Sequence, residues 1–181
     1  MARLPEIDPQ QATGKAKELL DGVQARLKIV PNFMRAMANS AAALDAYLSF
    51  NEKLSHGLLS AKLGELIAVV VADENSCEYC LSAHTAIAKM VGLNEEQILA
   101  GRDLNLGDAK IDAALRFARD VAAKRGQLNA SAIDAVRNAG YSDGEIAEIV
   151  ANVGLHVFTN YFNNVVKTEV DFPRVALRVA V

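Results

Sequence analysis

Two cysteines and a histidine near the middle of the chain have residue types and a spacing that could do redox chemistry. Cys77, Cys80 and His84 are separated by three and four residues, so a helix that begins near Cys77 would place all three on one face. The cysteines would then lie at a helix N-terminus, where free N–H groups and the helix dipole favour a thiolate. A thiolate attacks a peroxide or a disulfide, and His84 could take up or return the proton, because imidazole titrates close to neutral pH.

Glu65 is a fourth candidate, because it stands in an otherwise apolar run. The segment 63–72 is interrupted only by Gly64 and Glu65, and the helix it should form precedes the cysteines. Two consecutive helices joined by a short break tend to pack together. A buried carboxylate needs a partner, since an unpaired buried charge is costly. We expect this partner to be His84, or a cysteine thiol reached through a water molecule.

Other uses of these residues stay open at the level of sequence. The cysteines could be inert core residues, and Glu65 could be a solvated helix residue. A zinc site on Cys77, Cys80 and His84 would need His156 or Glu65 as a fourth ligand, and one helix presents three ligands awkwardly to a tetrahedral ion. His156 lies in an apolar, aromatic-rich stretch, which is more typical of a core histidine or a subunit contact than of a catalytic group.

The composition excludes several classes of protein. The 181 residues are 51% hydrophobic and 23% charged, with a formal net charge of −3, which is typical of a folded domain rather than a disordered chain. Lys and Arg number 19 against 22 Asp and Glu, without a basic run, so we expect no nucleic-acid partner. The longest apolar stretch, 66–72, is far shorter than the roughly 20 residues of a membrane span, so we expect no membrane association.

The cellular compartment follows from the same features. The first residues lack the apolar segment of a secretory signal, so we expect a cytoplasmic protein. In that reducing environment, two cysteines three residues apart indicate redox or metal chemistry rather than a structural disulfide. No haem-binding or flavin-binding motif is visible, and we expect no cofactor.

Helix signals follow one another along the chain and predict an all-α fold. Prolines stand only at positions 5, 9, 31 and 173, and alanine, the strongest helix former, occurs 31 times. Asn94 with Gln97 and Ser142 with Glu145 have the spacing of capping boxes. The expected helices cover 13–27, a stretch after Pro31, 41–54, 60–72, 77–91, 94–101, 108–126, 131–140 and 142–167.

We expect a single domain over 1–181, with the Cys-x-x-Cys core at about 60–105. The polar segment 73–76 should separate the two helices of this core. The C-terminal tail, 171–181, is apolar for a free end, and only its part from Arg174 onward has any strand-like alternation. We expect this tail to dock on its own subunit or on a neighbouring one.

The pattern of Glu65, Cys77, Cys80 and His84 resembles the Glu…Cys-x-x-Cys-x-x-x-His motif of the AhpD-like alkylhydroperoxidases. These proteins belong to the carboxymuconolactone decarboxylase superfamily. The resemblance to its peroxidase-related branch extends over about 5–173. The further similar segments are Pro5-Glu6-Ile7, Val30-Pro31-Asn32, Cys77-Glu78-Tyr79-Cys80, Ala83-His84-Thr85, Ala114-Leu115-Arg116-Phe117-Ala118 and Ala139-Gly140-Tyr141-Ser142-Asp143.

The resemblance implies a helical bundle that assembles into homo-oligomers, as trimers or hexamers. It also implies antioxidant defence by a thiol peroxidase that reduces organic hydroperoxides or H2O2. Cys80 would attack the peroxide and become a sulfenic acid, and Cys77 would resolve it as a disulfide. Glu65 and His84 would form a proton relay. A thiol reductant or a redox protein would then reduce the disulfide.

Three points stay open. The position at the helix end favours Cys77 as the more acidic thiol, whereas proximity to His84 favours Cys80. Tyr79 stands where the best-known members carry a second histidine, and a phenol with a pKa near 10 is a poorer proton shuttle, which predicts a slower relay or a different substrate. The alternative functions are a carboxymuconolactone decarboxylase-like enzyme, which needs no cysteine pair, and a non-catalytic thiol redox sensor.

Overall fold

The computed structural model describes residues 2–178, and within them the chain forms nine helices and no strand. This confirms the expected all-α fold. The helices are α1 (Gly14–Leu27), α2 (Asn32–Met37), α3 (Ala41–Ser55), α4 (Ala61–Glu74), α5 (Glu78–Met90), α6 (Glu95–Arg102), α7 (Ala109–Ala123), α8 (Ala130–Asn138) and α9 (Asp143–Val166). None of these helices is both long and apolar enough to cross a membrane.

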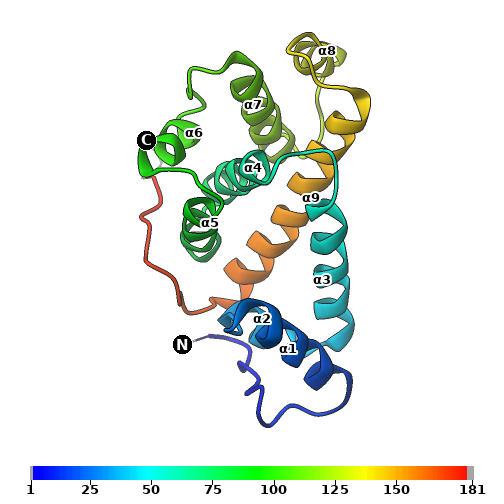
Figure 1. Ribbon diagram of the computed structural model, residues 1–181, viewed down its shortest axis with the longest axis vertical. Coiled ribbons are helices and arrows are strands. Elements are labelled where there is room, and N and C mark those ends of the chain that lie inside the picture. Colours follow the sequence, from blue (N-terminus) through cyan, green and yellow to red (C-terminus); the bar gives the residue numbers. More distant parts are fainter. Residues whose placement is uncertain (1, 179–181) are drawn as a thin grey trace.

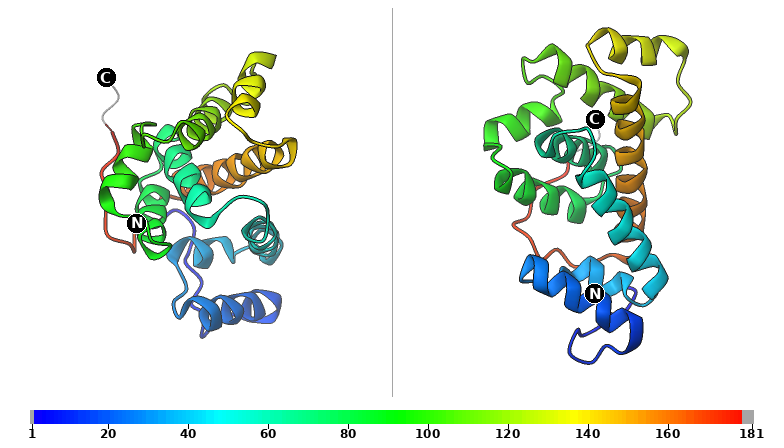
Figure 2. Two further views of the ribbon diagram at one scale, coloured as in Figure 1. Left: turned by 45° about the horizontal axis from the view of Figure 1, so that its top comes forward. Right: turned by 45° about the vertical axis from the view of Figure 1, so that its right-hand side comes forward.

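Helix α4 is the centre of the fold. It packs against α5, α6, α7 and α9 (Figure 1), and its run from Leu66 to Ala72 is buried on every side. A helix that is apolar all round must lie inside a protein, so this run determines which helix the others surround. Helices α1, α2 and α3 gather at the opposite end of the molecule from α7 and α8, as both views of Figure 2 show.

Helix starts follow the expected capping residues. The side chains of Ser40, Ser60 and Asp108 each accept a hydrogen bond from a backbone N–H in the first turn of their helix. Both capping boxes are formed, at the starts of α6 and α9. Helix α8 begins one residue earlier than expected, because its N-cap is Asn129 rather than Ser131.

Helix α4 ends two residues later than the expected end at Ala72. The prediction placed Asp73 in the polar break between the two helices, and this is wrong, because Asp73 lies within α4. The Asp73 side chain is only 10% exposed, and its carboxylate pairs with Arg102 at 2.8 Å and with Arg178 at 3.2 Å. With its charge neutralised by these two partners, Asp73 continues the helix.

The segment 169–178, which we call the C-terminal strap, leaves α9 and runs back over α2, α5 and α6 (Figure 1). The Asp171 carboxylate accepts a hydrogen bond from the backbone N–H of Asn32 at 2.8 Å, at the start of α2. The backbone N–H of Val175 donates to the Ser82 hydroxyl on α5 at 3.1 Å. Of the two docking modes expected for the tail, the structure therefore shows docking on its own chain, while residues 179–181 lie outside the described part.

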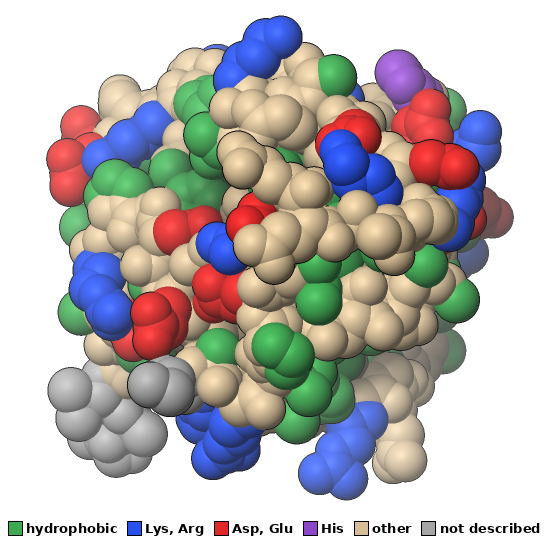
Figure 3. All heavy atoms as spheres, turned by 90° about the horizontal axis from the view of Figure 1, so that it is seen from below, with side chains coloured by type: hydrophobic (Ala, Val, Ile, Leu, Met, Phe, Trp, Pro, Cys, Tyr) green, Lys and Arg blue, Asp and Glu red, His purple; other side chains and the backbone are tan. Residues whose placement is uncertain are grey.

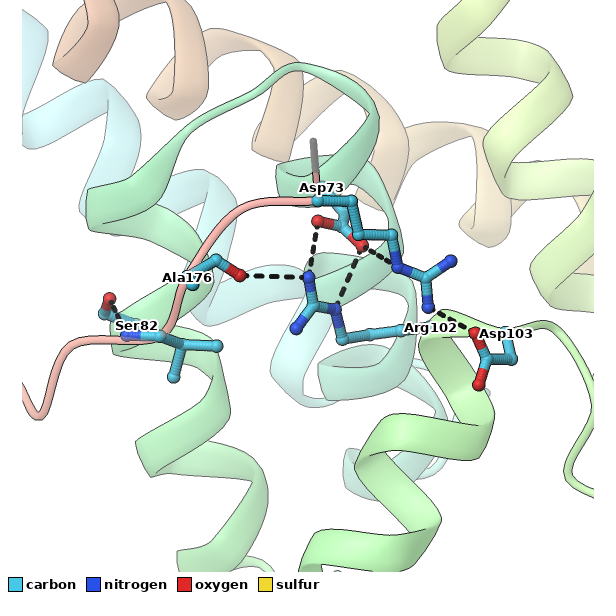
Figure 4. A network of polar contacts seen from close by, with 7 residues as sticks. Asp73, Ser82, Arg102, Asp103 and Ala176 are labelled. Atoms are coloured by element: carbon cyan, nitrogen blue, oxygen red, sulfur yellow. Dashed lines mark hydrogen bonds and ion pairs between the residues drawn. The ribbon is translucent and has the colours of Figure 1, made fainter. Parts of the chain in front are cut away.

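Ion pairs anchor the end of the strap. Arg102 donates to both oxygens of Asp73 and to the carbonyl oxygen of Ala176, at 3.2 Å in the latter case, and Arg178 pairs with Asp103 (Figure 4). Elsewhere on the surface, as on the face in Figure 3, basic and acidic side chains are interspersed with hydrophobic ones. The strap is thus held by specific charges on α4 and α6.

Candidate active site

The cysteine pair lies where α4 turns into α5. Ser76, with a φ of 51°, turns the chain between the two helices. Cys77 is the N-cap of α5, and its Sγ accepts the backbone N–H of Cys80 at 3.3 Å. The two cysteines form a disulfide, with Cα atoms 5.3 Å apart. This local geometry shows that the two cysteines are close enough to form a disulfide.

Glu65 and His84 form a hydrogen-bonded pair between α4 and α5. The distance from His84 Nδ1 to Glu65 Oε2 is 2.8 Å, and the two side chains are only 17% and 20% exposed. The structure thus shows His84 as the partner of Glu65, one of the two expected. Because a carboxylate only accepts, Nδ1 carries the proton and Nε2 is left as the acceptor.

Cys80, Glu65 and His84 line the same cavity, which has a volume of about 380 Å³. Cys77 is fully buried and does not reach this cavity. Three of the four expected site residues therefore line one cavity, and the fourth, Cys77, does not. Most of the other lining residues are apolar, and they include Leu27, Ile29, Pro31, Met34, Ala83, Ile87 and Met90.

Aromatic rings form one wall of the cavity. Tyr79 packs edge-to-face against Phe33 and against Phe172 of the strap, each with ring centroids 5.8 Å apart, and Phe33 packs likewise on Tyr47 at 5.2 Å. Burial, together with the nearby Asp171 carboxylate, raises the pKa of the Tyr79 phenol above its ordinary value. Tyr79 therefore stays protonated at neutral pH and contributes packing, in keeping with its expected weakness as a proton shuttle.

His156, on α9, also lines the cavity. Only 7% of its surface is exposed. Its ring packs edge-to-face on His84, with ring centroids 4.7 Å apart. Burial, and then the proximity of His84, lower the pKa of His156 well below its ordinary value. A core position is one of the two roles expected for His156, and the structure shows it in the core and also at the candidate site.

Three asparagines of α9 connect this helix to the cysteine turn. Asn164 donates to the carbonyl oxygen of Asn75 at 2.9 Å, and Asn75 donates to Asn160 at 3.0 Å. Asn163 donates from Nδ2 to Cys80 Sγ at 3.4 Å. The helical spacing of residues 156, 159, 160 and 163 is the signal that could have placed them on one buried face.

Other candidate groups lie outside this cluster. Glu78 is 44% exposed and pairs with Arg174 of the strap at 2.7 Å. His56 is exposed and is the C-cap of α3. Within residues 2–178, no three His, Cys, Asp or Glu side chains are arranged to hold a metal ion.

Comparison with known proteins identifies the class to which this fold and site belong. Residues 41–123, from α3 to α7, match the carboxymuconolactone decarboxylase family. A peroxidase-related protein from Silicibacter sp. TM1040 is 25% identical, with a TM-score of 0.81 over 92% of this chain and 88% of that chain. The family match and this structural likeness support the AhpD-like and carboxymuconolactone decarboxylase superfamily, in agreement with the expectation from the cysteine motif.

Two further solved structures share the fold. A peroxidase-related protein with an alkylhydroperoxidase AhpD core, from Ralstonia eutropha JMP134, is 22% identical, with a TM-score of 0.83 over 94% of this chain and 92% of that chain. A cysteine-to-alanine variant of the debrominase Bmp8, in complex with 2,3,4-tribromopyrrole, is 19% identical, with a TM-score of 0.79 over 94% of each chain. No curated protein matches the sequence.

Proposed function

We propose that the protein is a thiol-dependent peroxidase that reduces organic hydroperoxides or H2O2 through Cys77 and Cys80. One observation carries the proposal: the hydrogen-bonded pair of Glu65 and His84 opens on the same cavity as Cys80. A nucleophile, a base and space for a substrate are therefore in one place.

The reaction begins on the reduced protein. His84, held by Glu65, accepts the thiol proton of Cys80, and the thiolate attacks one peroxide oxygen. The O–O bond breaks, the alcohol leaves with the returned proton, and Cys80 becomes a sulfenic acid. The Cys77 thiol then displaces water from this sulfenic acid and forms the disulfide. A thiol reductant or a redox protein supplies the two electrons and two protons that restore the thiols.

The walls of the cavity favour an organic hydroperoxide over H2O2. A dry cavity of about 150 Å³ is enough to hold benzene, and the cavity beside Cys80 has about 380 Å³. Burying the apolar part of an organic hydroperoxide against this aromatic and aliphatic lining is favourable. H2O2 has no apolar part to bury. We therefore expect the larger hydroperoxides to be reduced more efficiently.

Counting thiols tests the proposal directly. Protein reduced with dithiothreitol and then desalted should lose two thiols per chain when it meets cumene hydroperoxide, with one peroxide consumed for each pair. The variant Cys80→Ser should consume none and keep its helicity by circular dichroism. Two thiols that stay reduced under excess peroxide would contradict the proposal and favour the decarboxylase-like alternative. A disulfide that forms once but supports no turnover with reductant would indicate a redox sensor.

A reductive dehalogenase is a second candidate, favoured by the aromatic wall beside Cys80. A bromoaromatic compound plus two thiols would yield the debrominated ring, bromide, a proton and the Cys77–Cys80 disulfide. The same reduced protein, mixed with a bromopyrrole, would then release one bromide for every two thiols lost. Bromide release without peroxide consumption would replace the first proposal by this one.

A further inference from the structure

Within residues 2–178, Asn163 is the only side chain that forms a hydrogen bond with the sulfur of Cys80. We propose that Asn163 is a further catalytic residue, which stabilises the thiolate of Cys80 and so makes Cys80 rather than Cys77 the attacking cysteine. The inference rests on the proposed thiol chemistry of this site.

The contact is suited to a thiolate in particular. Asn163 is 4% exposed, lines the cavity, and points its amide nitrogen at Cys80 Sγ at 3.4 Å. An amide N–H2 group only donates, and a thiolate only accepts. Hydrogen bonds to a charged partner are about twice as strong as those between neutral groups, so this contact stabilises the thiolate more than the thiol. Asn163 itself transfers no proton.

Thr168 fixes which end of the amide faces the sulfur. Its hydroxyl Oγ1 lies 2.7 Å from Asn163 Oδ1, and both residues are buried. With the hydroxyl donating to Oδ1, the nitrogen is turned toward Cys80. The reversed amide would place a carbonyl oxygen against the anionic sulfur, which is repulsive. Thr168 is therefore a positioning residue for Asn163.

The end of α9 holds the two side chains together. Lys167 adopts a left-handed conformation with φ 57°, which ends the helix. The backbone N–H groups of Lys167 and Thr168 both donate to the carbonyl oxygen of Asn163, at 2.8 and 3.4 Å. This turn brings Thr168 back over Asn163, so the donor is oriented before any substrate arrives.

The same geometry distinguishes the two cysteines. Cys77 Sγ receives the backbone N–H of Cys80 at 3.3 Å, but it is fully buried and does not reach the cavity. Cys80 receives a side-chain donor and lines the cavity. In the sequence, the helix end favours Cys77 and proximity to His84 favours Cys80. The hydrogen bond from Asn163 favours Cys80.

The test measures the reactivity of Cys80 without any peroxide. In a Cys77→Ser background, which leaves one thiol, the rate of alkylation by iodoacetamide is followed against pH. Asn163→Leu keeps a similar volume and removes the donor. We expect the pH of half-maximal rate to rise by about one unit, which makes alkylation at pH 7 roughly tenfold slower. The limiting rate at high pH should be unchanged.

Two further comparisons separate this role from a structural one. Thr168→Val should shift the profile in the same direction by a smaller amount, and Thr168→Ser should restore it, because serine keeps the hydroxyl. Asn164→Ala is the matched control on the same helix, since its amide contacts Asn75 and not the sulfur. It should leave the profile unchanged.

An unchanged midpoint in Asn163→Leu would overturn the inference, and so would an equal shift in Asn164→Ala. If Asn163→Leu does not fold, as judged by circular dichroism, the Thr168→Val and Thr168→Ser pair decides the question alone. The expected shift in a protein that turns over no peroxide would support the role of Asn163 and contradict only the proposed peroxidase activity.

Discussion

At the scale of single residues, the hydrogen bond between Glu65 and His84 decides what the imidazole can do. Because Nδ1 is engaged by the carboxylate at 2.8 Å, Nε2 is the nitrogen left to exchange a proton. The Glu65 carboxylate also places a negative charge beside the imidazole. A neutral amide in place of Glu65 would keep the shape and lose this charge.

We therefore expect Glu65→Gln to lower the rate of peroxide reduction by about 10²–10⁴-fold, the range of general acid–base catalysis. Steady-state kinetics with cumene hydroperoxide and excess dithiothreitol would measure this. Glu96→Gln, at an exposed position on α6, is the control and should have no effect. An unchanged rate in Glu65→Gln, with normal helicity, would make Glu65 a structural residue only.

His156 couples stability to pH. Burial lowers its pKa in the folded protein, whereas in the unfolded chain it titrates near pH 6.5. Below pH 6.5 the unfolded chain therefore binds more protons than the folded one, and stability falls as the pH falls. Above pH 6.5 both states hold a neutral imidazole, and the contribution of His156 no longer changes.

We expect the free energy of unfolding to drop by about 1.4 kcal/mol through His156 between pH 7.5 and pH 5.5. Urea denaturation of the oxidised protein and of His156→Gln at both pH values isolates this contribution, since other groups titrate in both proteins. The loss should be smaller in His156→Gln by that amount. Equal losses in the two proteins would show that His156 accepts a proton while folded.

At the scale of elements, the packing of α5 and α9 on α4 builds the candidate site, and the C-terminal strap closes one side of it. Phe172 of the strap lines the cavity and packs on Tyr79. The strap is anchored beyond this point by the buried pair of Asp73 and Arg102 and by the half-exposed Arg178. The buried pair should contribute more to stability, because solvent screens exposed ion pairs.

We expect Arg102→Met to lower the free energy of unfolding by about 1.5–3 kcal/mol, because it removes charge-assisted hydrogen bonds to a largely buried carboxylate. Arg178→Ala should cost less than about 1 kcal/mol, as is typical of exposed pairs. Urea denaturation would compare both variants with the parent protein. Equal effects of the two substitutions would contradict this ranking of the anchors.

At the scale of the whole molecule, the outer face of α9 has no charge. The stretch 149–166 contains no Asp, Glu, Lys or Arg, and along it Val150, Phe158, Tyr161 and Val165 are 42–67% exposed. A helix that exposes several large apolar side chains and carries no charge over this length is typical of one covered by another surface. Two copies could bring these faces together without any repulsion between like charges, which fits the homo-oligomer implied by the family resemblance.

We expect the protein to be a homo-oligomer in solution and Val165→Glu to lower its mass, because the substitution buries a charge in the contact. Light scattering coupled to gel filtration would measure this. Leu99→Glu, at an exposed apolar position on α6, is the matched control and should leave the mass unchanged. A monomeric parent protein would contradict the expected assembly.

The sequence by itself was enough to predict the helices, most of their N-caps and the motif of Glu65, Cys77, Cys80 and His84. These features depend on residues within one or two turns of each other, where capping and periodicity act. Even the pairing of Glu65 with His84 joins neighbouring helices across a short break. The family resemblance rested on the same local motif.

Tertiary structure alone decided which distant groups complete the site and which ones anchor the strap. Asn163 meets Cys80 across 83 positions of sequence, His156 comes from the same helix, and Arg178 neutralises Asp73 from the strap. None of these contacts has a local signal, because each depends on how α9 and the strap pack against α4 and α5. A buried polar side chain shows its function only once its partner is known, and that partner is set by the packing of the helices.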